Sequence, residues 1–243
     1  MRVAVMQPYL FPYLGYFQLL ATADKFLFLN DVTFINRGWI NRNRILACGQ
    51  PLLFTVPLEH ASQNRLIKDI RVHGDQRWRS KLLKTFDQSY HKAPYFAQVM
   101  PLVERALEPT FIAECAVRSI ELVAVYLQLP TVLGPSTSTY GNAHLKGQCR
   151  ILDLCRAEGA THYINAPGGA CLYNGSDFDR QGVDLQFIRP QLRPYPQPAA
   201  AFVPGLSIID LLMQVPAAEA RTHLGFYQLD QSHGVTAASP YFA

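Results

Sequence analysis

The alternation of strand-like and helix-like segments constrains the fold of this chain more than any other feature. Residues 2–6, RVAVM, form an apolar run with the length of a buried strand, and residues 25–32 and 51–58 form two more. Further along, the helical pattern HLKGQCRILDLCRAEG ends beside Gly159, a typical C-terminal cap, and leads into THYINAPGG, a strand with a tight turn. Such alternation is typical of a parallel sheet. We therefore predict an α/β fold with a mostly parallel, doubly wound sheet.

The middle of the chain predicts helices that cap or lid the functional site. Residues 75–129 contain two or three helical patterns interrupted by prolines. A strand at 183–190, a proline-rich loop at 189–198 and a helix at 206–215 follow. No internal repeat or clear linker divides the sequence, so we expect a single domain over residues 1–243.

Composition narrows the class of protein. Hydrophobic residues make up 49% and charged residues 16% of the 243 residues, which is typical of a globular protein. No run of 18 apolar residues predicts a membrane span, and prolines interrupt the only apolar stretch near the start, which argues against a signal peptide. The five cysteines form no C-x-x-C pair, which favours reduced thiols, a cytoplasmic protein and no metal site.

The segment QPYLFPYLGYF at 7–17 follows the first predicted strand. Its two prolines remove backbone donors and restrict φ, so we predict a rigid loop. In an α/β protein a ligand often binds beyond the carboxyl end of a strand, which makes Gln7, Tyr13, Gly15 and Tyr16 candidates for substrate binding. The same aromatic residues can equally pack the loop against the core, and both interpretations stay open.

A basic segment, RGWINRNR, lies in a stretch without acidic residues between Asp31 and Glu59. Guanidinium groups bind phosphates in a bidentate manner, and amides add oriented hydrogen bonds. The alternative is a solvated loop. The net charge of +4 and the lack of a basic tract argue against a nucleic acid partner. The candidate phosphate ligands are Asn41, Arg42, Asn43 and Arg44.

The segment YGNAHLKGQCR predicts a helix start with several chemically active side chains. Free N–H groups and the helix dipole favour an anion there, although an ordinary surface helix start has the same pattern. His144 is a candidate proton carrier and Lys146 a candidate phosphate ligand, and we predict a catalytic role for both. Gly147 and Arg150 are candidates for substrate binding.

Two further segments supply candidates. NAPGG contains Asn165, Gly168 and Gly169, and its Pro-Gly-Gly turn permits close approach of a ligand to the backbone. Turns of this composition are also common without a ligand. Asp210 in LSIIDLLM is a candidate catalytic acid or base, but the helix dipole alone also favours an acid in a first turn.

A resemblance covers nearly the whole chain to about residue 215. The blocks MQPYLFPYLGYFQLL, DKFLFLNDVTF, WINRNRI, HLKGQCRILDLCRAEGATHYINAPGG and FVPGLSIIDLLM resemble, in order, those of the WbqC-like protein family. That resemblance implies a bacterial protein of O-antigen or other surface-polysaccharide biosynthesis, and it implies a pathway more firmly than a reaction. Cys149 departs from the acidic or polar residue expected in KGQCRI, which puts a functional role for that position in doubt.

The opening loop is also similar in layout to the H-x-G-H region of nucleotidylyltransferases and class I synthetases, which implies a HUP-like layout of the fold. Tyr13 and Tyr16 stand where the two histidines would be. Tyrosine can donate a hydrogen bond to phosphate, but it lacks the charge of imidazole near neutral pH. Shared layout does not establish shared function, so adenylyl transfer can be lost or altered here.

Together these observations predict a cytoplasmic transferase that acts on a nucleotide-activated or amino sugar. Arg42, Arg44 and Lys146 are expected to hold phosphates, Tyr13 and Tyr16 to line the sugar or base pocket, and His144 to carry the proton. The alternatives are a nucleotidylyltransferase or ATP-dependent ligase and a non-catalytic nucleotide-sugar binding protein. The partner is expected to be a phosphorylated or nucleotide-linked small molecule, while the donor, the acceptor, any cofactor and the oligomeric state stay open.

Overall fold

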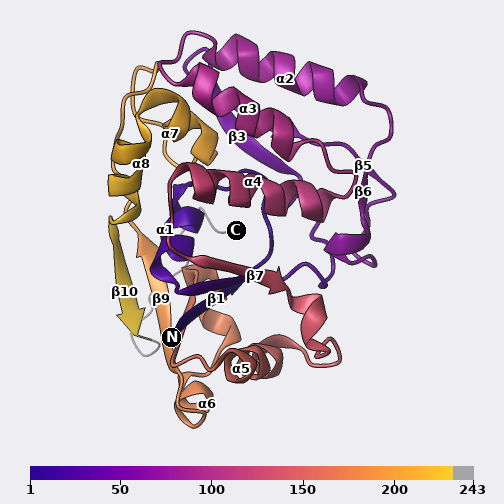
Figure 1. The fold of residues 1–243 in the computed structure, drawn as a ribbon, viewed down its shortest axis with the longest axis vertical. Coiled ribbons are helices and arrows are strands. Elements are labelled where there is room, and N and C mark those ends of the chain that lie inside the picture. Colours follow the sequence, from indigo (N-terminus) through magenta and orange to yellow (C-terminus); the bar gives the residue numbers. More distant parts are fainter. Residues whose placement is uncertain (232–243) are drawn as a thin grey trace.

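The computed structural model describes residues 1–231, and its centre is a six-stranded sheet (Figure 1). The strands run in the order β10-β9-β8-β1-β2-β7. Every neighbouring pair is parallel except β10 and β9, which are antiparallel, so the predicted mostly parallel sheet is confirmed. The strands are β1 (Arg2–Met6), β2 (Lys25–Phe28), β7 (Val132–Ser136), β8 (His162–Asn165), β9 (Asp184–Pro190) and β10 (Tyr227–Gln231).

Successive residues of the central strands are buried on opposite faces of the sheet. In β1, Ala4 belongs to one cluster of buried apolar side chains, and Val3 and Val5 belong to another. The same alternation separates Phe26 from Leu27 in β2. Because side chains point to alternate faces of a strand, burial of both sets requires cover on both faces, as parallel sheets have.

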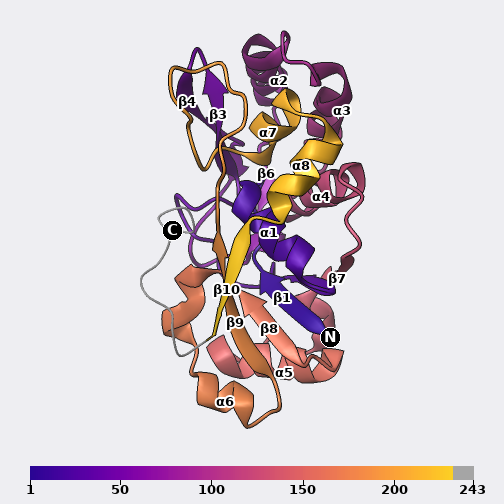
Figure 2. The ribbon, with the colours of Figure 1, turned by 90° about the vertical axis from the view of Figure 1, so that its left-hand side faces the viewer.

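Helices supply that cover. α5 and α6 pack on one face, with the smaller cluster, and the remaining helices pack with the larger one. Figure 1 shows α4 and α5 on opposite sides of β7, and Figure 2 shows α1 and α8 beside the sheet. The helices are α1 (Leu14–Thr22), α2 (Arg77–Tyr90), α3 (Phe96–Ala106), α4 (Ile112–Tyr126), α5 (Gly147–Glu158), α6 (Gly175–Asp179), α7 (Ile208–Gln214) and α8 (Ala217–Leu224).

The expectation of a third buried strand at 51–58 is wrong. β3 (Arg42–Ala47) and β4 (Gln50–Thr55) form an antiparallel hairpin outside the central sheet, and β5 (Leu58–Glu59) pairs only with β6 (Arg71–Val72). Leu52 and Leu53 are 39% and 49% exposed, whereas Phe54 is buried against Phe86 of α2 with ring centroids 5.1 Å apart. The apolar run is therefore a half-covered hairpin strand, because α2 covers only one of its faces.

Several predictions about helices are confirmed. The segment 75–129 forms α2, α3 and α4, and α5 ends at Gly159, whose φ of 63° is the left-handed cap conformation. Of the proline-rich loop predicted at 189–198, residues 191–198 contain no helix or strand, whereas Arg189 and Pro190 are the last residues of β9. Within residues 1–231 no helix is both long enough and apolar enough to span a membrane.

The strand order reverses between β1 and β8. From β1 the chain adds β2 and then β7 on one side, and it then returns to place β8 and β9 on the other side. In open α/β sheets, ligands bind beyond the carboxyl ends of the strands at such a reversal. We therefore expect the functional site at the carboxyl ends of β1, β2, β7 and β8.

Candidate functional site

A buried ion pair organises the carboxyl ends of β2 and β7. Asp31 follows β2, and its Oδ2 lies 2.5 Å from Nη2 of Arg150 in α5. The side chains are 3% and 6% exposed, respectively. Thr137 donates to Oδ1 of Asp31 at 2.6 Å, and Nε of Arg150 donates to Oδ1 of Asn142 at 3.1 Å. These bonds attach the first turns of α5 to the ends of two parallel strands.

The ion pair sets the charge state of its acid. Burial alone would raise the pKa of Asp31, because it disfavours the ionised form. Hydrogen bonds from Arg150 and Thr137, together with the guanidinium charge, outweigh that effect and hold the pKa of Asp31 below its ordinary value of 3.8. Asp31 is thus an anion at neutral pH and Arg150 is its counter-ion.

Arg150 is consequently not available as a direct phosphate ligand in this arrangement. It is 5% exposed, and its guanidinium is occupied by Asp31 and Asn142. The sequence placed Arg150 beside a helix start, where an exposed arginine would reach an anion, but its side chain turns inward. We therefore describe it as a positioning residue.

The residues just before Arg150 are exposed. Lys146 directly precedes α5, Gly147 begins it with a φ of 51°, and His144 lies in the preceding loop. The first turn of α5 also contacts the loop after β8, because the side chain of Gln148 accepts a hydrogen bond from the backbone N–H of Asn174 at 2.5 Å. The start of α5 therefore lies between the ends of β2 and β7 and the loop that follows β8.

At the reversal itself, β1 leads to Gln7 and β8 leads to Asn165. The Oε1 atom of Gln7 is buried without a hydrogen-bond partner within residues 1–231. Asn165 is engaged, since it donates to the hydroxyl of Tyr173 at 3.0 Å and accepts from the N–H of Ala166 at 2.7 Å. Gly168 is exposed, and a Cβ on Gly169 would lie only 2.7 Å from Nδ2 of Asn165. Gly169 is therefore required for close packing against Asn165, whereas Gly168 leaves the backbone of the turn open to a ligand.

The opening loop is anchored to three separate elements. Phe11, at a φ of 42°, donates its N–H to Oγ of Ser119 in α4 at 2.9 Å. Its carbonyl accepts from Asn43 of β3 and from Ser207, the N-cap of α7, both at 2.8 Å. Every backbone polar group of Phe11 is thus satisfied although the residue is buried. This loop holds α4, α7 and the hairpin together.

The two tyrosines of the loop are buried rather than displayed. Tyr16 is fully buried against Phe26, and its hydroxyl donates to the carbonyl of Gln7 at 3.0 Å. Tyr13 is 7% exposed, and a Cβ on Gly15 would lie 2.4 Å from its hydroxyl. A side chain at position 15 would therefore clash with the ring of Tyr13. Tyr13 lines a small recess together with Asn43 and Arg44, so a role for it in ligand binding stays a prediction. Tyr16 and Gly15 serve packing in this arrangement, and the proposed site does not include them.

Replacing Tyr16 with phenylalanine is expected to cost stability without affecting ligand binding. The change keeps the ring and removes only the hydroxyl that bonds Gln7, so the free energy of unfolding should fall by about 0.5 to 1.5 kcal/mol. Urea unfolding measures this loss. A variant with parental stability but weakened binding of a sugar nucleotide would instead show that the Tyr16 hydroxyl contacts the ligand.

The basic segment uses most of its polar atoms within the protein. Asn41 donates to the carbonyl of Val56 at 2.8 Å, and Asn43 is 3% exposed. Arg42 donates to the carbonyls of Gly38 and Arg37. Arg44 donates to the carbonyl of Gly205 at 3.3 Å and lies 5.5 Å from the ring centre of Trp39. These contacts hold the loops in place. Asn43 and Arg44 also line one small recess and Asn41 and Arg42 line another, and their role as phosphate ligands stays a prediction.

Asp210 lies in the protein interior, apart from the helix start. It is 0% exposed and accepts hydrogen bonds from three side chains on two other segments: Tyr90 at 2.7 Å, Tyr195 at 2.8 Å and Gln197 at 2.7 Å. Burial raises the pKa of Asp210, and these three hydrogen bonds only partly offset the effect. In Figure 1, α7 and α5 lie at opposite ends of the molecule, so Asp210 does not join His144 and Lys146.

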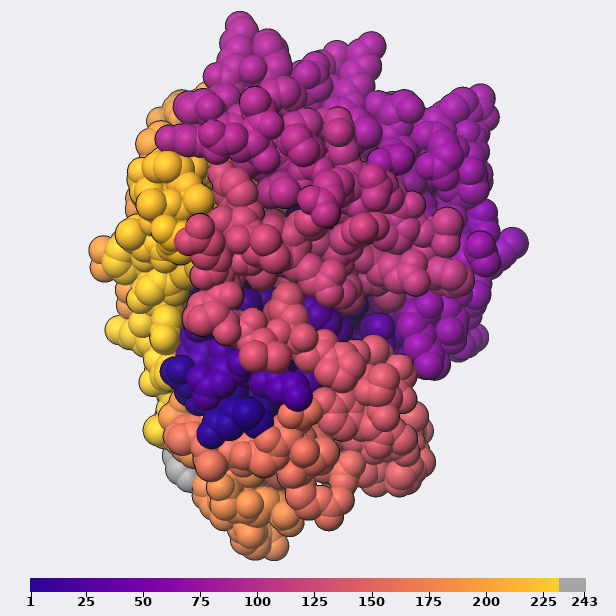
Figure 3. Space-filling view, viewed as in Figure 1, coloured from indigo at the N-terminus to yellow at the C-terminus, as the bar shows by residue number. Residues whose placement is uncertain are grey.

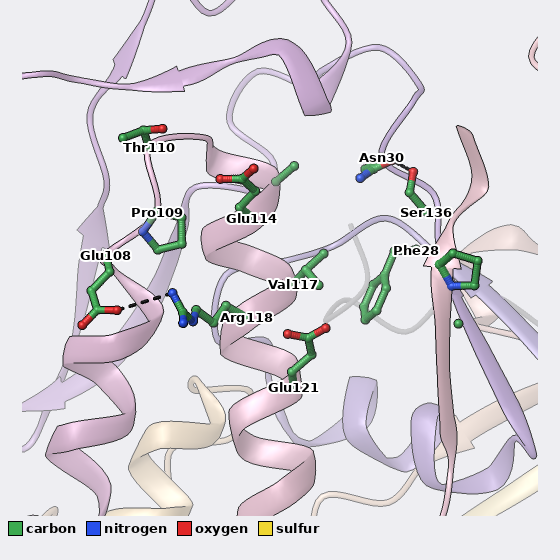
Figure 4. Close-up of a pocket in the computed structure, with 13 residues that line it drawn as sticks. Phe28, Asn30, Glu108, Pro109, Thr110, Glu114, Val117, Arg118, Glu121 and Ser136 are labelled. Atoms are coloured by element: carbon green, nitrogen blue, oxygen red, sulfur yellow. Dashed lines mark hydrogen bonds and ion pairs between the residues drawn. The ribbon is translucent and has the colours of Figure 1, made fainter. Parts of the chain in front are cut away.

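A cleft of about 770 Å³ opens beside the ends of β2 and β7, on the α4 side of the sheet. We call it the α4 cleft. Figure 3 shows a recess on this face, with purple residues at its floor between two pink regions. Figure 4 shows α4 on one side and the strand ends on the other. Its lining includes Phe28, Asn30, Pro135 and Ser136 from the strand ends and Glu114, Val117, Arg118 and Glu121 from α4.

The α4 cleft and the start of α5 share a wall. Asn30 and Ser136 line the cleft and are hydrogen bonded to each other. Their neighbours in sequence, Asp31 and Thr137, are hydrogen bonded to each other, and Asp31 holds Arg150 of α5. The two strand ends thus separate two potential binding regions at the same edge of the sheet.

The sequence interpretation missed the α4 cleft. Glu114 and Glu121 lie seven residues apart on a largely apolar helix that also contains Arg118, a spacing that puts both acids on one face. That spacing was the signal in the sequence from which the cleft wall could have been predicted.

Within residues 1–231, no group of three or more His, Cys, Asp or Glu side chains is placed to hold a metal ion.

Comparison with known proteins places the chain in a family. A model of the WbqC-like protein family matches residues 7–222. The chain belongs to this family. Across 234 residues it is 28% identical to the uncharacterized protein Rv1507c of Mycobacterium tuberculosis, with 93% of this chain and 98% of that protein covered. No solved structure matches the chain.

Proposed function

We propose that this WbqC-like protein is a transferase that acts on a nucleotide-activated or amino sugar in surface-polysaccharide biosynthesis. One observation supports it most directly: two regions suited to ligands, the start of α5 and the α4 cleft, are built on the same two strand ends. A transfer reaction needs two substrates brought together, and adjacent sites lower the entropic cost of doing so. Family membership is consistent with this assignment.

The start of α5 is the proposed site for the phosphates of the donor. Backbone N–H groups at a helix start and the helix dipole both favour an anion. Lys146 adds a positive charge there, and the buried side-chain Oε1 of Gln7, which has no hydrogen-bond partner within residues 1–231, is the proposed acceptor for a hydroxyl of the same ligand. Gly168 leaves the neighbouring turn open. His144 is the proposed base that takes the proton from the attacking group of the acceptor.

Ligand binding and turnover test the proposed function. The parent protein is screened by thermal shift against ATP, UDP-sugars, dTDP-sugars and acyl-CoA, because a ligand at 100 times its Kd stabilises by about 2.7 kcal/mol. A shift with a sugar nucleotide, followed by turnover with a sugar acceptor, is the expected result. A shift with ATP alone favours a ligase, and a sugar-nucleotide shift without turnover favours a binding protein. No shift with any sugar nucleotide contradicts the proposal.

Replacing Lys146 with methionine is expected to weaken binding of the sugar nucleotide by about 1.5 to 3 kcal/mol, or roughly 10- to 150-fold in Kd. The change keeps the apolar part of the side chain and removes the charge. Because a cation at a helix start opposes the dipole, the free protein should be no less stable. Isothermal titration at low salt measures the loss, with Lys84→Met on α2 as the matched control, since Lys84 is also exposed. Parental affinity in Lys146→Met removes this residue from the site.

A further inference from the structure

The α4 cleft carries more negative charge than its own side chains neutralise. Three carboxylates and one guanidinium line it. The guanidinium of Arg118 is paired with Glu108, with Nη1 and Oε2 3.4 Å apart. Glu114 and Glu121 take part in no ion pair within residues 1–231, and Figure 4 shows both carboxylates beside the opening. The cleft is therefore electrostatically suited to a cation.

The α4 wall combines charge with an apolar surface. Glu114, Val117, Arg118 and Glu121 have the spacing of one helical stripe, while Ile120 beside them is buried in the core. In Figure 4 Val117 and Glu121 point toward the strand ends, whereas Arg118 points away from them, toward Glu108. A ligand in this cleft thus meets a carboxylate and an apolar patch on the same helix.

The opposite wall supplies an aromatic ring and polar groups. Phe28 projects toward Val117 in Figure 4. Beyond it, Asn30 and Ser136 present an amide and a hydroxyl at the cleft surface. An aromatic face suits the C–H surface of a sugar ring, and amide and hydroxyl groups suit its hydroxyls. A volume of about 770 Å³ lies within the range of small-molecule sites and is ample for one sugar unit.

We infer that the α4 cleft binds a sugar with a free, protonated amine. Glu121 holds the ammonium, Phe28 and Val117 contact the ring, and Asn30 and Ser136 bind its hydroxyls. Glu114 lies about 10 Å along the helix from Glu121, at seven residues of about 1.5 Å each, so it contributes mainly through its field. This inference rests on the proposed function in one respect: it makes the cleft the site of the acceptor in the transfer.

The protonation of Glu121 gives amine binding an expected pH dependence. Burial of its carboxyl raises the pKa of Glu121, and the nearby charge of Arg118 only partly offsets that effect. A bound ammonium favours the ionised carboxylate, as an opposite charge does. The other charged groups facing the cleft are Glu108, Glu114 and Arg118. Amine binding should therefore weaken as the pH falls through the raised pKa of Glu121.

Isothermal titration with three probes tests the assignment. Glucosamine has both the amine and the hydroxyls, N-acetylglucosamine lacks the charge, and cyclohexylamine lacks the hydroxyls. Glucosamine is expected to bind at least fivefold more tightly than either of the others. A clear preference for cyclohexylamine would indicate a general amine site, and a clear preference for N-acetylglucosamine would indicate a neutral sugar site, so either result overturns the inference.

Variants locate the binding. Glu121→Gln is expected to weaken glucosamine binding about five- to tenfold, which corresponds to about 1 to 1.4 kcal/mol. Glu114→Gln should cause a smaller loss. Glu104→Gln, which removes an exposed carboxylate from neighbouring α3, is the control and should bind as the parent does. Equal binding by Glu121→Gln and the parent, or no binding of glucosamine at millimolar concentration, overturns the inference.

The two proposals fail in different ways. Glucosamine titration needs no nucleotide and no turnover, and it does not depend on Lys146. If a sugar nucleotide binds the parent but glucosamine does not, only the assignment of the cleft fails. If glucosamine binds and loses affinity in Glu121→Gln while no sugar nucleotide binds, the cleft assignment stands and the proposed transferase function fails.

Discussion

Replacing Arg150 with methionine is expected to lower the free energy of unfolding by about 3 to 5 kcal/mol. The change leaves Asp31 as a buried carboxylate that keeps the hydrogen bond from Thr137 and a backbone N–H but has lost its counter-ion. Loss of one partner of a buried ion pair is costly because the other charge stays out of water. Because Arg150 also anchors α5 to the ends of β2 and β7, the start of that helix should loosen as well.

Urea unfolding measures this effect, and α5 itself offers the control. Arg156 also pairs with an aspartate on this helix, but its side chain is 77% exposed. Arg156→Met should therefore change stability by less than about 1 kcal/mol, as exposed ion pairs contribute little. Equal losses in Arg150→Met and Arg156→Met would show that the buried pair has no special role.

The cost of Arg150→Met should depend on pH. In the parent, the pKa of Asp31 is below its ordinary value of 3.8, so this acid contributes stability above that pH and loses it on further acidification. In the variant, burial without the guanidinium should raise the pKa of Asp31. Protonation of Asp31 as the pH falls then removes the buried charge and recovers part of the lost free energy of unfolding. The difference between the two proteins should therefore be largest near neutral pH and shrink toward pH 4.

Replacing Asp210 with alanine is expected to cost about 3 to 5 kcal/mol, because three buried donors lose their acceptor. These donors are Tyr90 of α2 and Tyr195 and Gln197 of the proline-rich loop, so the change should detach that loop from the helices. Asp87→Ala on α2, where the aspartate is exposed, is the control and should have little effect. Thermal and urea unfolding measure the loss.

Asp210→Asn separates charge from hydrogen bonding. It keeps one carbonyl acceptor, so its loss should be smaller than that of the alanine variant. Because the pKa of Asp210 is raised, the parent gains stability as pH falls through that pKa, and the asparagine variant does not. A variant with parental stability at every pH but no turnover would contradict the structural role and return Asp210 to catalysis.

Local patterns explain which elements were predictable. The sequence was sufficient to place the strands β1 and β8, which are short apolar runs, and the helix α5, which has an apolar face and a glycine cap. The run at 51–58 has the same composition as a buried strand, and only its pairing with β3 shows that it lies outside the sheet. Strand pairing is a non-local property, and composition does not encode which partner is found.

The same distinction divides the candidate site. The sequence by itself determined that a helix begins beside His144, Lys146 and Gly147, since capping and spacing are local. Only the tertiary structure decided that Arg150 turns inward to Asp31, which is 119 residues away, and that Tyr16 is buried beneath the opening loop. It also decided that acids of α4 face the ends of β2 and β7 across a cleft. The physical reason is that burial and charge pairing depend on contacts between distant segments, whereas propensity and periodicity act within one segment.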